Sequence, residues 1–536
     1  MSDYAGTGAL LRLALRLDRV RATAWTVGLA GLTTVSVSSN KDLYGTPEKR
    51  AELAETVDTN PAMLALGGRA FDLSTVGGVS AYQLIAFMTA LIGLMSILLV
   101  VRHTRAEEES GRAELAGSAV VGRKAWLSSG LLLVIGINLV IGVLTALGLM
   151  SLGLPAGGSV AFAAGGAGAG IFFAITAGVA AQLTDSARTA TGIASAVLGL
   201  SYLLRATGDA ASGSDDSGVS WLTWLSPIGW AEMMRPYADE DWWVLLLFVA
   251  AAGVLLAALA ALVDRRDIGG GVLPQKLGPA VAAPALRSPL ALAWRLQRGS
   301  LLAWTLGFVV AGAAFGGVAE GMVGIAEDNA DIDELLRDLG GNGDIVDVFL
   351  GTITSLIGVV AGAYAVQSSL RLSGEESTHR ADPVLTTPVD RLRWAGSHLV
   401  IAAVGSVVLL ASAGLAAGVV HGLRSDDLGG EVPRVLGAAL AQVPAVWTLV
   451  GLSALLFGLL PRFTVVSWVA LAVALVIGQF GDLLKLDQTV MNVSPFTHVP
   501  NLPSADFEAT PLLLLGLLAA ALVTAGLGGF RRRDVA

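Results

Sequence analysis

Runs of about 20 apolar residues alternate along the whole chain with short polar segments. A helix of about 20 residues is long enough to cross the ~30 Å hydrocarbon core of a bilayer. The pattern therefore predicts an all-helical protein that crosses a membrane many times. We predict twelve spans, at residues 22–39, 80–101, 126–151, 159–183, 189–206, 242–263, 301–320, 349–371, 395–421, 436–460, 464–483 and 511–530.

The composition supports a membrane protein and excludes several kinds of site. The 536 residues are 54% hydrophobic and only 14% charged, with a mean hydropathy of +0.69, whereas a soluble domain carries about 25% charged residues. The chain has no cysteine, which excludes disulfides, thiolate metal sites and a cysteine nucleophile. Its five histidines form no ligand pair at helical spacing. We therefore expect no metal or other cofactor in this chain.

The distribution of charge predicts the orientation. An even number of spans puts both termini on one side of the membrane. If that side is the cytoplasm, it carries 24 of the 34 Lys and Arg but only 14 of the 43 Asp and Glu. Basic loops stay inside, so both termini are predicted to be cytoplasmic. The net charge of −9 then belongs to the outer loops, chiefly 207–241 and 326–347, where we interpret it as a solvated surface.

The second half of the chain repeats the first. "LALRLDRVRATAWTVG" at 13–28 matches "LAWRLQRGSLLAWTLG" at 292–307, an offset of 279 residues. Further on the offset is 268, which aligns Ser226-Pro227 with Ser494-Pro495, and "RRDI" at 265–268 matches "RRDV" at 532–535. Such internal similarity indicates duplicated structural units. We therefore predict two six-span halves, residues 1–263 and 289–536, related by an axis along the membrane normal and joined by a cytoplasmic linker at 264–288.

Each half begins with an amphipathic segment. In residues 8–21 the basic residues Arg12, Arg16 and Arg19 share one helical face, and leucines occupy the other. This pattern predicts a helix that lies in the inner membrane interface before the first span, and it differs from the plain apolar core of a cleavable signal peptide. The second half repeats the segment more weakly at 288–300.

Two kinds of function are disfavoured by missing features. The P-loop pattern G-x-x-x-x-G-K-[ST] does not occur, so the chain is not expected to bind ATP in the P-loop manner. The glycine run "GGAGAG" at 165–170 lies inside a predicted span, where small residues allow close helix packing. Among the carboxylates, Glu320 and Asp482 lie at span ends and none lies near a span centre. An ion-driven carrier normally needs a buried ionisable residue, so an ion-coupled antiporter is disfavoured.

A charged segment follows the second span of each half. These are "RAEEESGRAEL" at 105–115 and "GEESTHRAD" at 374–382, and both begin the pattern E-E-x-[ST]-x-R-A-[ED]-x₆-V-x-R-x-x-W at the 268-residue offset. Glu108 with Arg112, and Glu376 with Arg380, are i,i+4 pairs that favour a helix. A solvated loop would not require the same spacing twice. We therefore interpret the two segments as short helices on the inner face that fit a symmetric cytoplasmic dimer.

These features together resemble a known family. The charged segments, the outer "YGTPEKRAELAETVDTNPAMLALGG" at 44–68 and the Ser-Pro before the last span of each half resemble ABC-2-type permeases. The closest likeness is to the fused twelve-span permeases of bacterial polyketide-antibiotic and multidrug exporters, the tetronasin-type group, over essentially the whole chain. The resemblance implies a type V exporter fold in the bacterial plasma membrane, with interfacial elbow helices and cytoplasmic coupling helices.

The resemblance also implies a partner. One permease chain would sit on a separate, homodimeric ABC ATPase, which binds ATP and Mg²⁺; no nucleic-acid partner is expected. The contacts would come from two coupling loops, residues 102–125 and 372–393. The implied docking residues are Glu107, Glu108, Arg112, Glu114 and Arg123 in the first loop, and Glu375, Glu376, Arg380, Asp382 and Arg391 in the second. The second loop departs from the pattern, because His379 replaces a glycine and Pro383 and Pro388 interrupt it, so the two docking sites are expected to be unequal.

The resemblance places the substrate path between the halves, lined by the first, second and fifth spans of each. Methionine and aromatic side chains suit adaptable apolar cavities, although interface anchoring, core packing or lipid contact is the alternative reading for each. The candidates are Trp25, Phe87, Met88, Met95, Trp304, Phe308 and Tyr364. The outer segment 46–57 begins Thr46-Pro47-Glu48, an N-cap followed by proline, and predicts a small outer helix that could cover the exit.

The sequence thus predicts a transport subunit rather than an enzyme. The leading hypothesis is the permease of an ATP-driven exporter of hydrophobic or amphipathic compounds such as antibiotics. One alternative is an ABC permease that exports a lipid or cell-wall precursor, and another is an ion-coupled secondary drug carrier. A membrane enzyme is disfavoured because no cluster of His, Asp or Ser converges at one membrane face.

Overall fold

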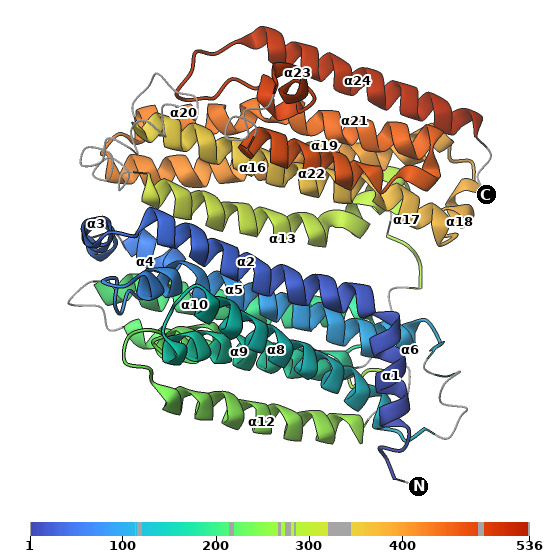
Figure 1. Cartoon of the computed structure of the whole chain (residues 1–536). Helices are drawn as coiled ribbons and strands as arrows, with labels where there is room; N and C mark the ends of the chain where they lie inside the picture. Colours follow the sequence, from blue (N-terminus) through green and yellow to red (C-terminus); the bar gives the residue numbers. More distant parts are fainter. Residues whose placement is uncertain are drawn as a thin grey trace. The chain divides into compact units, whose positions relative to one another are not determined.

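The computed structural model describes residues 2–59, 61–112, 114, 121–213, 219–265, 270–273, 280–283, 286–319, 345–480 and 487–533 (Figure 1). Every regular element in these ranges is helical, so the predicted all-α class is confirmed. The chain divides into two compact units, Met1–Leu277 and Gly278–Ala536, and the division falls within the predicted linker 264–288. Glu320, Asp482 and most of the outer loop 326–347 lie outside the described residues.

Unit 1 is built from long apolar helices with short helices at both ends. Its elements are α1 (Thr7–Leu17), α2 (Arg19–Leu43), α3 (Pro47–Thr59), α4 (Pro61–Gly67), α5 (Val76–Val101), η1 (Arg102–Ala106), α6 (Glu107–Glu109), α8 (Ala125–Ser151), α9 (Ala156–Leu183), α10 (Ala187–Ala210), η2 (Ala211–Gly213), η3 (Ser220–Leu225), α11 (Pro227–Met233), η4 (Trp242–Val244) and α12 (Leu245–Val263). The predicted outer helix at 46–57 corresponds to α3 and begins at the predicted proline.

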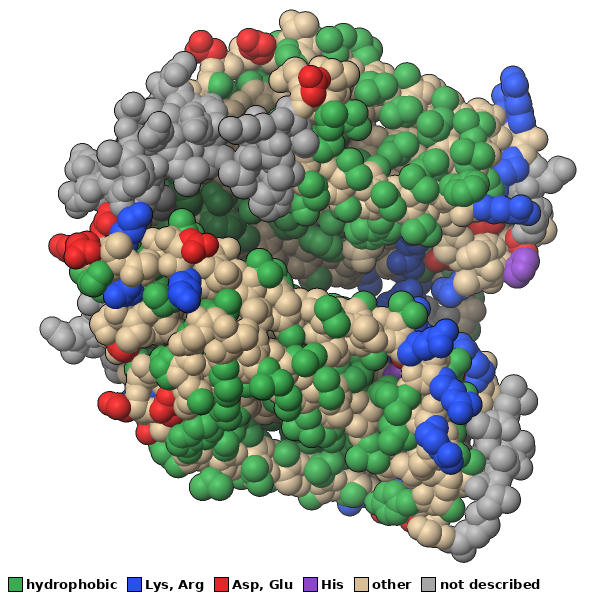
Figure 2. Space-filling model, viewed as in Figure 1, with side chains coloured by type: hydrophobic (Ala, Val, Ile, Leu, Met, Phe, Trp, Pro, Cys, Tyr) green, Lys and Arg blue, Asp and Glu red, His purple; other side chains and the backbone are tan. Residues whose placement is uncertain are grey.

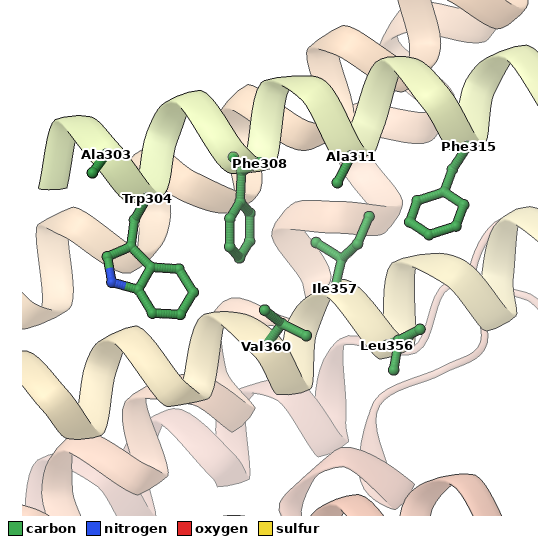
Figure 3. A pocket seen from close by; sticks show the side chains of 9 residues that line it. Ala303, Trp304, Phe308, Ala311, Phe315, Leu356, Ile357 and Val360 are labelled. Carbon is green, nitrogen blue, oxygen red and sulfur yellow. The ribbon is translucent and has the colours of Figure 1, made fainter. Parts of the chain in front are cut away.

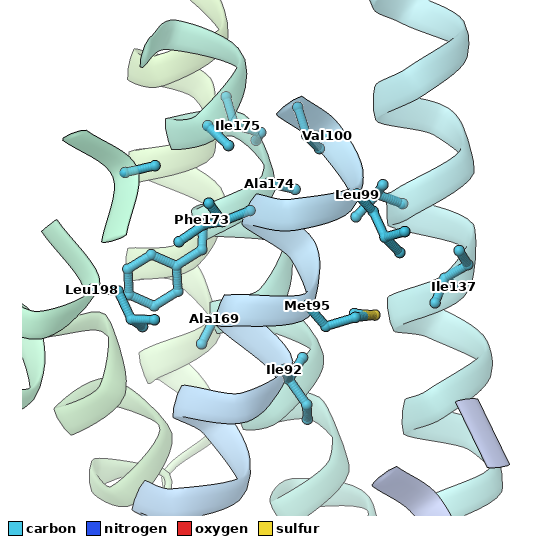
Figure 4. Close-up of a cluster of buried hydrophobic side chains, with 14 of the residues drawn as sticks. Ile92, Met95, Leu99, Val100, Ile137, Ala169, Phe173, Ala174, Ile175 and Leu198 are labelled. Atoms are coloured by element: carbon cyan, nitrogen blue, oxygen red, sulfur yellow. The ribbon is translucent and has the colours of Figure 1, made fainter. Parts of the chain in front are cut away.

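The core of unit 1 surrounds α9, which packs against α5, α8 and α12. The "GGAGAG" run lies within α9, and a Cβ on Gly170 would come within 1.9 Å of Asn138 Oδ1 on α8. Without side chains at these positions the helices approach closely, which is the usual role of small residues in membrane bundles. The interpretation of the run as a packing feature is therefore confirmed. Figure 4 shows the apolar side chains of α5, α8, α9 and α10 that fill this core.

Unit 2 repeats the long helices of unit 1 with changes at its ends. Its elements are α13 (Pro289–Val318), α16 (Ile345–Ser369), α17 (Arg371–Ser377), α18 (Asp382–Leu385), α19 (Arg391–Arg424), α20 (Leu428–Ala441), α21 (Val443–Leu459), η6 (Pro461–Phe463), α22 (Val466–Phe480), α23 (Gln488–Met491), η7 (Pro495–His498) and α24 (Ala509–Arg532). Here α19 packs against α13 and α20, and α21 packs against α24. Gly458 and Gly526 allow the latter contact, because a Cβ on Gly458 would lie 1.9 Å from the carbonyl oxygen of Gly526.

A helix covers each of the twelve predicted spans as far as they are described. Among the described residues, nine helices are long and apolar enough to cross a membrane. The three predicted spans outside this set correspond to α2, α10 and the shorter α22. The span predicted at 436–460 is interrupted at Gln442, because Pro444 lacks the N–H that would continue the helical hydrogen bonding from α20 into α21.

The predicted interfacial helices differ between the units, and one expectation is wrong. In unit 1, α1 is a separate helix that ends at Leu17, four residues before the predicted end at 21. In unit 2, the segment 288–300 is not a separate elbow helix, because α13 runs unbroken from Pro289 to Val318. The repeat aligns Asp18, which separates α1 from α2, with Gln297 inside α13. The difference therefore follows from what each of these two side chains binds.

Candidate functional site: the coupling loops and an apolar groove

The first coupling loop continues from the end of α5. The chain passes through the π-helical turn η1 into α6, which ends at Glu109. Gly111 follows with a φ of +74°, a conformation that favours glycine. Arg105 in η1 is buried; it pairs with the carboxylate of Glu108 and donates a hydrogen bond to the carbonyl oxygen of Gly270 at 2.9 Å. The loop is therefore fixed to the end of unit 1 by a buried guanidinium.

A second polar cluster ties the elbow helix to this loop. The buried carboxylate of Asp18 accepts from Arg21 on α2 at 3.1 Å and from Arg102 at 3.2 Å, and His103 Nε2 lies 2.6 Å away. Burial raises the pKa of Asp18, but the charges and hydrogen bonds of His103 and Arg102 outweigh burial and hold it below its usual value of 3.8. The elbow and the coupling loop of unit 1 are thus joined through one ionised side chain.

At the equivalent place in unit 2, Gln297 replaces Asp18. Its side chain is buried and lies 3.1 Å from His398 Nδ1, and Ser368 donates to its Oε1. These partners come from α19 and α16. An uncharged amide satisfied by two neighbouring helices needs no break in its own helix, so α13 continues through this position.

The second coupling loop contains the short helices α17 and α18. Between them His379 has a φ of +55°, the same left-handed conformation that Gly111 adopts at the matching position of the repeat. Glu376 accepts two hydrogen bonds from Arg533 NH2, at 2.7 and 2.8 Å. Arg371 Nε lies 3.5 Å from the carboxylate of Glu375. This loop is therefore fixed to the chain's C-terminal end rather than to a buried arginine of its own.

The ten predicted docking residues fall into two groups. Arg123 and Arg391 donate to the carbonyl oxygens of Val263 and Arg533, at the ends of α12 and α24, so each closes the C-terminal end of its own unit's last helix. With them, Glu108, Glu375 and Glu376 are engaged in intramolecular ion pairs. Of the other five, Glu107 and Arg112 pair with each other within their own loop, Asp382 lies 3.1 Å from His379, and Glu114 and Arg380 are exposed.

The predicted i,i+4 pairs are not the pairs that the structure shows. Arg112 Nε lies 3.4 Å from Glu107, and Glu108 pairs with Arg105 three residues before it. In the second loop Glu376 pairs with Arg533. The reason is that α6 ends at Glu109 and α17 at Ser377, and the left-handed residue that follows each helix turns the chain before it reaches Arg112 or Arg380. Lys and Arg side chains nevertheless gather at the coupling-loop end of each unit (Figure 2).

An apolar groove of about 520 Å³ runs between α13 and α16 of unit 2. In Figure 3, Trp304, Phe308 and Phe315 project from α13 toward Ile357 and Val360 of α16. Trp304 Nε1 donates to Gln367 Oε1 at 2.9 Å, which fixes the indole at one end of the groove. Apolar walls with few polar groups suit a hydrophobic ligand. The groove therefore unites two of the predicted substrate-path residues, Trp304 and Phe308, on one surface.

Comparison with known proteins shows that this chain is similar to permeases. The family model described as "Multidrug efflux system permease Rv1217c, C-terminal domain" matches residues 8–263 and again residues 286–531. A multidrug efflux system permease protein, Rv1217c, of Mycobacterium tuberculosis (strain ATCC 25618 / H37Rv) is 43% identical over 535 residues, which cover 100% of this chain and 96% of that protein. The chain belongs to this family of multidrug efflux system permeases.

The other predicted substrate-path residues of this permease lie in different surroundings. Tyr364 is buried beside Trp304, with ring centroids 6.2 Å apart. Met88 and Met95 are buried in unit 1, where Met95 points toward Ile137 of α8 (Figure 4). In contrast, Phe87 is 51% exposed, and Trp25 is half-buried against the core of unit 1. The two methionines therefore fit core packing, the alternative interpretation, rather than a substrate path.

Sequence reasoning missed a buried ionic cluster in unit 1 of this permease. Arg205 NH1 lies 3.1 Å from Glu232 Oε1 and 3.6 Å from Asp209 Oδ2, and all three side chains are buried. Arg69 Nε pairs with Asp209 Oδ1 at 3.0 Å, and Thr223 donates to the same oxygen. The expectation that residues 207–241 form only a solvated acidic loop is wrong for this part of the segment.

Burial raises the pKa of Glu232 well above its ordinary range. The residue lies in α11, which begins with Ser226 as N-cap and Pro227 at the first position. Ser-Pro is a helix-start signal, and it could have indicated that the acidic residue five positions on belongs to a packed helix. Arg205 lies beside both carboxyl groups and Arg69 pairs with Asp209, so this polar cluster joins α10, α11 and the segment after α4.

Proposed function

We propose that this chain is the membrane permease subunit of an ATP-driven ABC exporter that moves hydrophobic or amphipathic compounds, such as antibiotics and drugs, out of the cell. The observation that carries the proposal is the similarity to a multidrug efflux system permease along the whole chain. The apolar groove of unit 2 supplies a surface that suits such compounds. No bond of the transported compound is broken by this subunit.

The motor in this proposal is a separate chain. The sequence carries no P-loop, so a homodimeric ABC ATPase would bind ATP and Mg²⁺, two copies to one permease chain. Each coupling loop would contact one ATPase through the exposed members of its charged set, including Glu114 and Arg380. Closure of the ATPase dimer would then move the coupling loops, which η1 and α17 link directly to the long helices α5 and α16.

We assign the chain to the tetronasin-type group of ABC-2 permeases, with twelve spans in two six-span halves in the bacterial plasma membrane. The proposal counts α2, α10 and α22 as spans, although they are shorter or less apolar than the other nine. Both termini would be cytoplasmic, since basic residues dominate that side. Residues 1–263 and 289–536 would form the halves, and 264–288 the cytoplasmic linker.

The docking test uses exposed residues. Charge reversal at Glu108 and Glu376 would break intramolecular ion pairs, so loss of function there would not identify docking. We instead choose Glu114→Lys combined with Arg380→Glu, with Asp506→Lys, an exposed residue of the segment before α24, as the matched control. The expected result is loss of the co-purifying ATPase and of drug efflux in the double variant alone, measured by mass spectrometry of the affinity-purified complex and by cellular drug accumulation.

Two outcomes would change the assignment. If wild-type permease purifies without a P-loop ATPase and its efflux stops when a proton uncoupler is added, the chain is a secondary carrier. If efflux needs ATPase but cells lacking the permease accumulate a lipid or cell-wall precursor instead of drug, the exported compound belongs to the envelope.

A further inference from the structure

Unit 2 contains a second cavity, of about 670 Å³, that the proposed function does not use. It lies between α21, α22 and α24 and is bounded at one end by the turn η7. Its walls are mainly apolar, with leucines such as Leu449, Leu452, Leu514 and Leu518. The cavity exists because α24 packs closely on α21, whereas α22 contacts α21 much more loosely.

The cavity is long and has one polar end. Along α24 its lining extends from Thr510 to Leu522, which at 1.5 Å per residue is roughly 18 Å. One leaflet of the hydrocarbon core is about 15 Å thick, half of the ~30 Å total. Asn492, His498, Glu508 and Thr510 line the end nearest η7, and this end lies away from the coupling-loop end of unit 2 (Figure 1). Thr448 lines the wall farther along, where its hydroxyl donates to carbonyl oxygens of its own helix. The length and the polarity therefore match one alkyl chain attached to a polar head group.

The polar end offers hydrogen-bond acceptors. Glu508 is exposed there, and although it precedes α24 its side chain makes no capping hydrogen bond. His498 Nε2 lies 3.1 Å from the carbonyl oxygen of Asn492, which only accepts, so Nε2 is the donor and Nδ1 of the neutral ring is left as an acceptor. A carboxylate and an imidazole acceptor favour a head group that carries donors, such as an ammonium, and disfavour an anionic one.

The equivalent place in unit 1 is filled with aromatic rings. The aligned Ser-Pro dipeptides match Trp230 with His498, and the aligned "RRD" ends match Phe248 with Leu515. In unit 1 the rings of Trp230 and Phe248 lie 5.3 Å apart, and Phe172 packs on the same indole at 6.0 Å. In unit 2, His498 and Leu515 both line the cavity. The cavity is therefore present in unit 2, whereas aromatic side chains fill the equivalent place in unit 1.

We propose that this cavity binds one acyl chain of a lipid from the surrounding bilayer, with a donor-bearing head group such as an ammonium between His498 and Glu508. The lipid belongs to the outer leaflet under the orientation given in the proposed function. The binding itself does not depend on that orientation or on export.

The test transplants the aromatic residues of unit 1 into unit 2. The variant H498W/L515F should fill the cavity, and Leu517→Phe, on an exposed face of α24 outside the lining, is the matched control. The probe is a lysophosphatidylethanolamine with a diazirine in its acyl chain, photolysed in membranes that contain the full-length permease. We expect labelling of the α21 and α24 peptides in the wild type and the control, reduced roughly tenfold or more in the double variant, which corresponds to about 1.4 kcal/mol of binding free energy.

A second, milder variant guards against misfolding. Glu508→Gln changes only an exposed side chain and should keep acyl-chain labelling while it removes the preference for the ammonium head over an anionic lysophosphatidylglycerol probe. Undiminished labelling in H498W/L515F, or equal labelling by both head groups in the wild type, would overturn the proposal. Removal of the label by an exported drug would overturn the lipid assignment and make the cavity a site for the transported compound. Because labelling needs neither ATPase nor transport, failure here leaves the exporter assignment untouched.

Discussion

The residue in the left-handed conformation differs between the two coupling loops, and this difference has a measurable effect on stability. Gly111 and His379 occupy the same repeat position with φ of +74° and +55°, and a side chain in this region costs about 1–2 kcal/mol. Replacing His379 by glycine removes that cost but loses an exposed contact with Asp382, which contributes little. We expect H379G to raise the free energy of unfolding by up to about 1 kcal/mol, measured as a higher Tm of the purified permease. His379→Ala keeps the Cβ and is the control; an equal Tm for both variants would contradict the explanation.

The buried ionic cluster allows a sharper prediction at the residue scale. Arg205→Ala leaves the buried carboxylates of Asp209 and Glu232 without their shared partner, and breaking a buried pair in this way costs about 3–5 kcal/mol. Arg235→Ala is the control, since its guanidinium is 44% exposed and pairs with Asp241 at 3.4 Å; a surface pair contributes about 0–1 kcal/mol. The Tm of both variants in detergent checks the prediction, and similar losses would show that the cluster is effectively solvated.

At the scale of elements, the junction of α1, α2 and η1 depends on the charge of Asp18. Asp18→Asn should lower the free energy of unfolding by about 1.5–3 kcal/mol, the usual contribution of hydrogen bonds to a charged group. Because the folded pKa is lowered below 3.8, this contribution is present above pH 3.8 and is lost as the pH falls through the folded pKa. The difference in Tm between the wild type and D18N should therefore persist at pH 7 and pH 5 and shrink only below about pH 4.

A neighbouring acidic residue provides the control for this prediction. Asp3→Asn changes a carboxylate that is 61% exposed and 3.8 Å from Lys124, so it should alter Tm little at any pH. A D18N difference that disappears already near neutral pH would show that Asp18 is not the ionised group that holds the elbow.

The sequence predicted well those helices whose position is determined by hydrophobicity alone. Long apolar runs identified the positions of α5, α8, α9, α12 and α19, because a helix is the only open structure that satisfies its backbone within a bilayer. The failures occurred where a few polar contacts decide instead. The unbroken α13 depends on Gln297 finding partners on two other helices. The burial of Glu232 depends on Arg205, 27 residues before it in the sequence. Neither set of partners leaves a periodic signal.

The candidate site was predicted in the same uneven way. The repeated charged pattern identified two matching segments, one after α5 and one after α16, since its spacing survives in the sequence; their role in coupling stays a prediction. It did not distinguish the arginines that close α12 and α24 from the exposed residues, because both kinds obey the same pattern. Of the residues that line the groove between α13 and α16, the sequence predicted only Trp304 and Phe308. Their neighbours Phe315 and Ile357 carry no distinguishing sequence feature.

At the scale of the whole molecule, the two units share an arrangement of long helices but differ in their buried polar groups and cavities. Each has its own hydrophobic core, which is the requirement for a unit to fold by itself. Yet the cluster around Arg205 has no charged counterpart at the aligned positions, where Glu232 corresponds to Pro500, and the acyl-chain cavity of unit 2 is filled by rings in unit 1. A second copy of either unit would therefore lack a feature that the other supplies.

This asymmetry predicts the behaviour of a divided permease. Residues 1–277 and 278–536, expressed as separate chains, should each insert and remain soluble in mild detergent, because the division leaves both cores intact. Neither unit alone should lower cellular drug accumulation, and co-expression should restore efflux, measured with the ATPase present. Efflux by one unit alone would mean that two copies of it can replace the natural pair, and the differences between the units would then be incidental to transport. Aggregation of both separate units would instead show that their cores depend on each other.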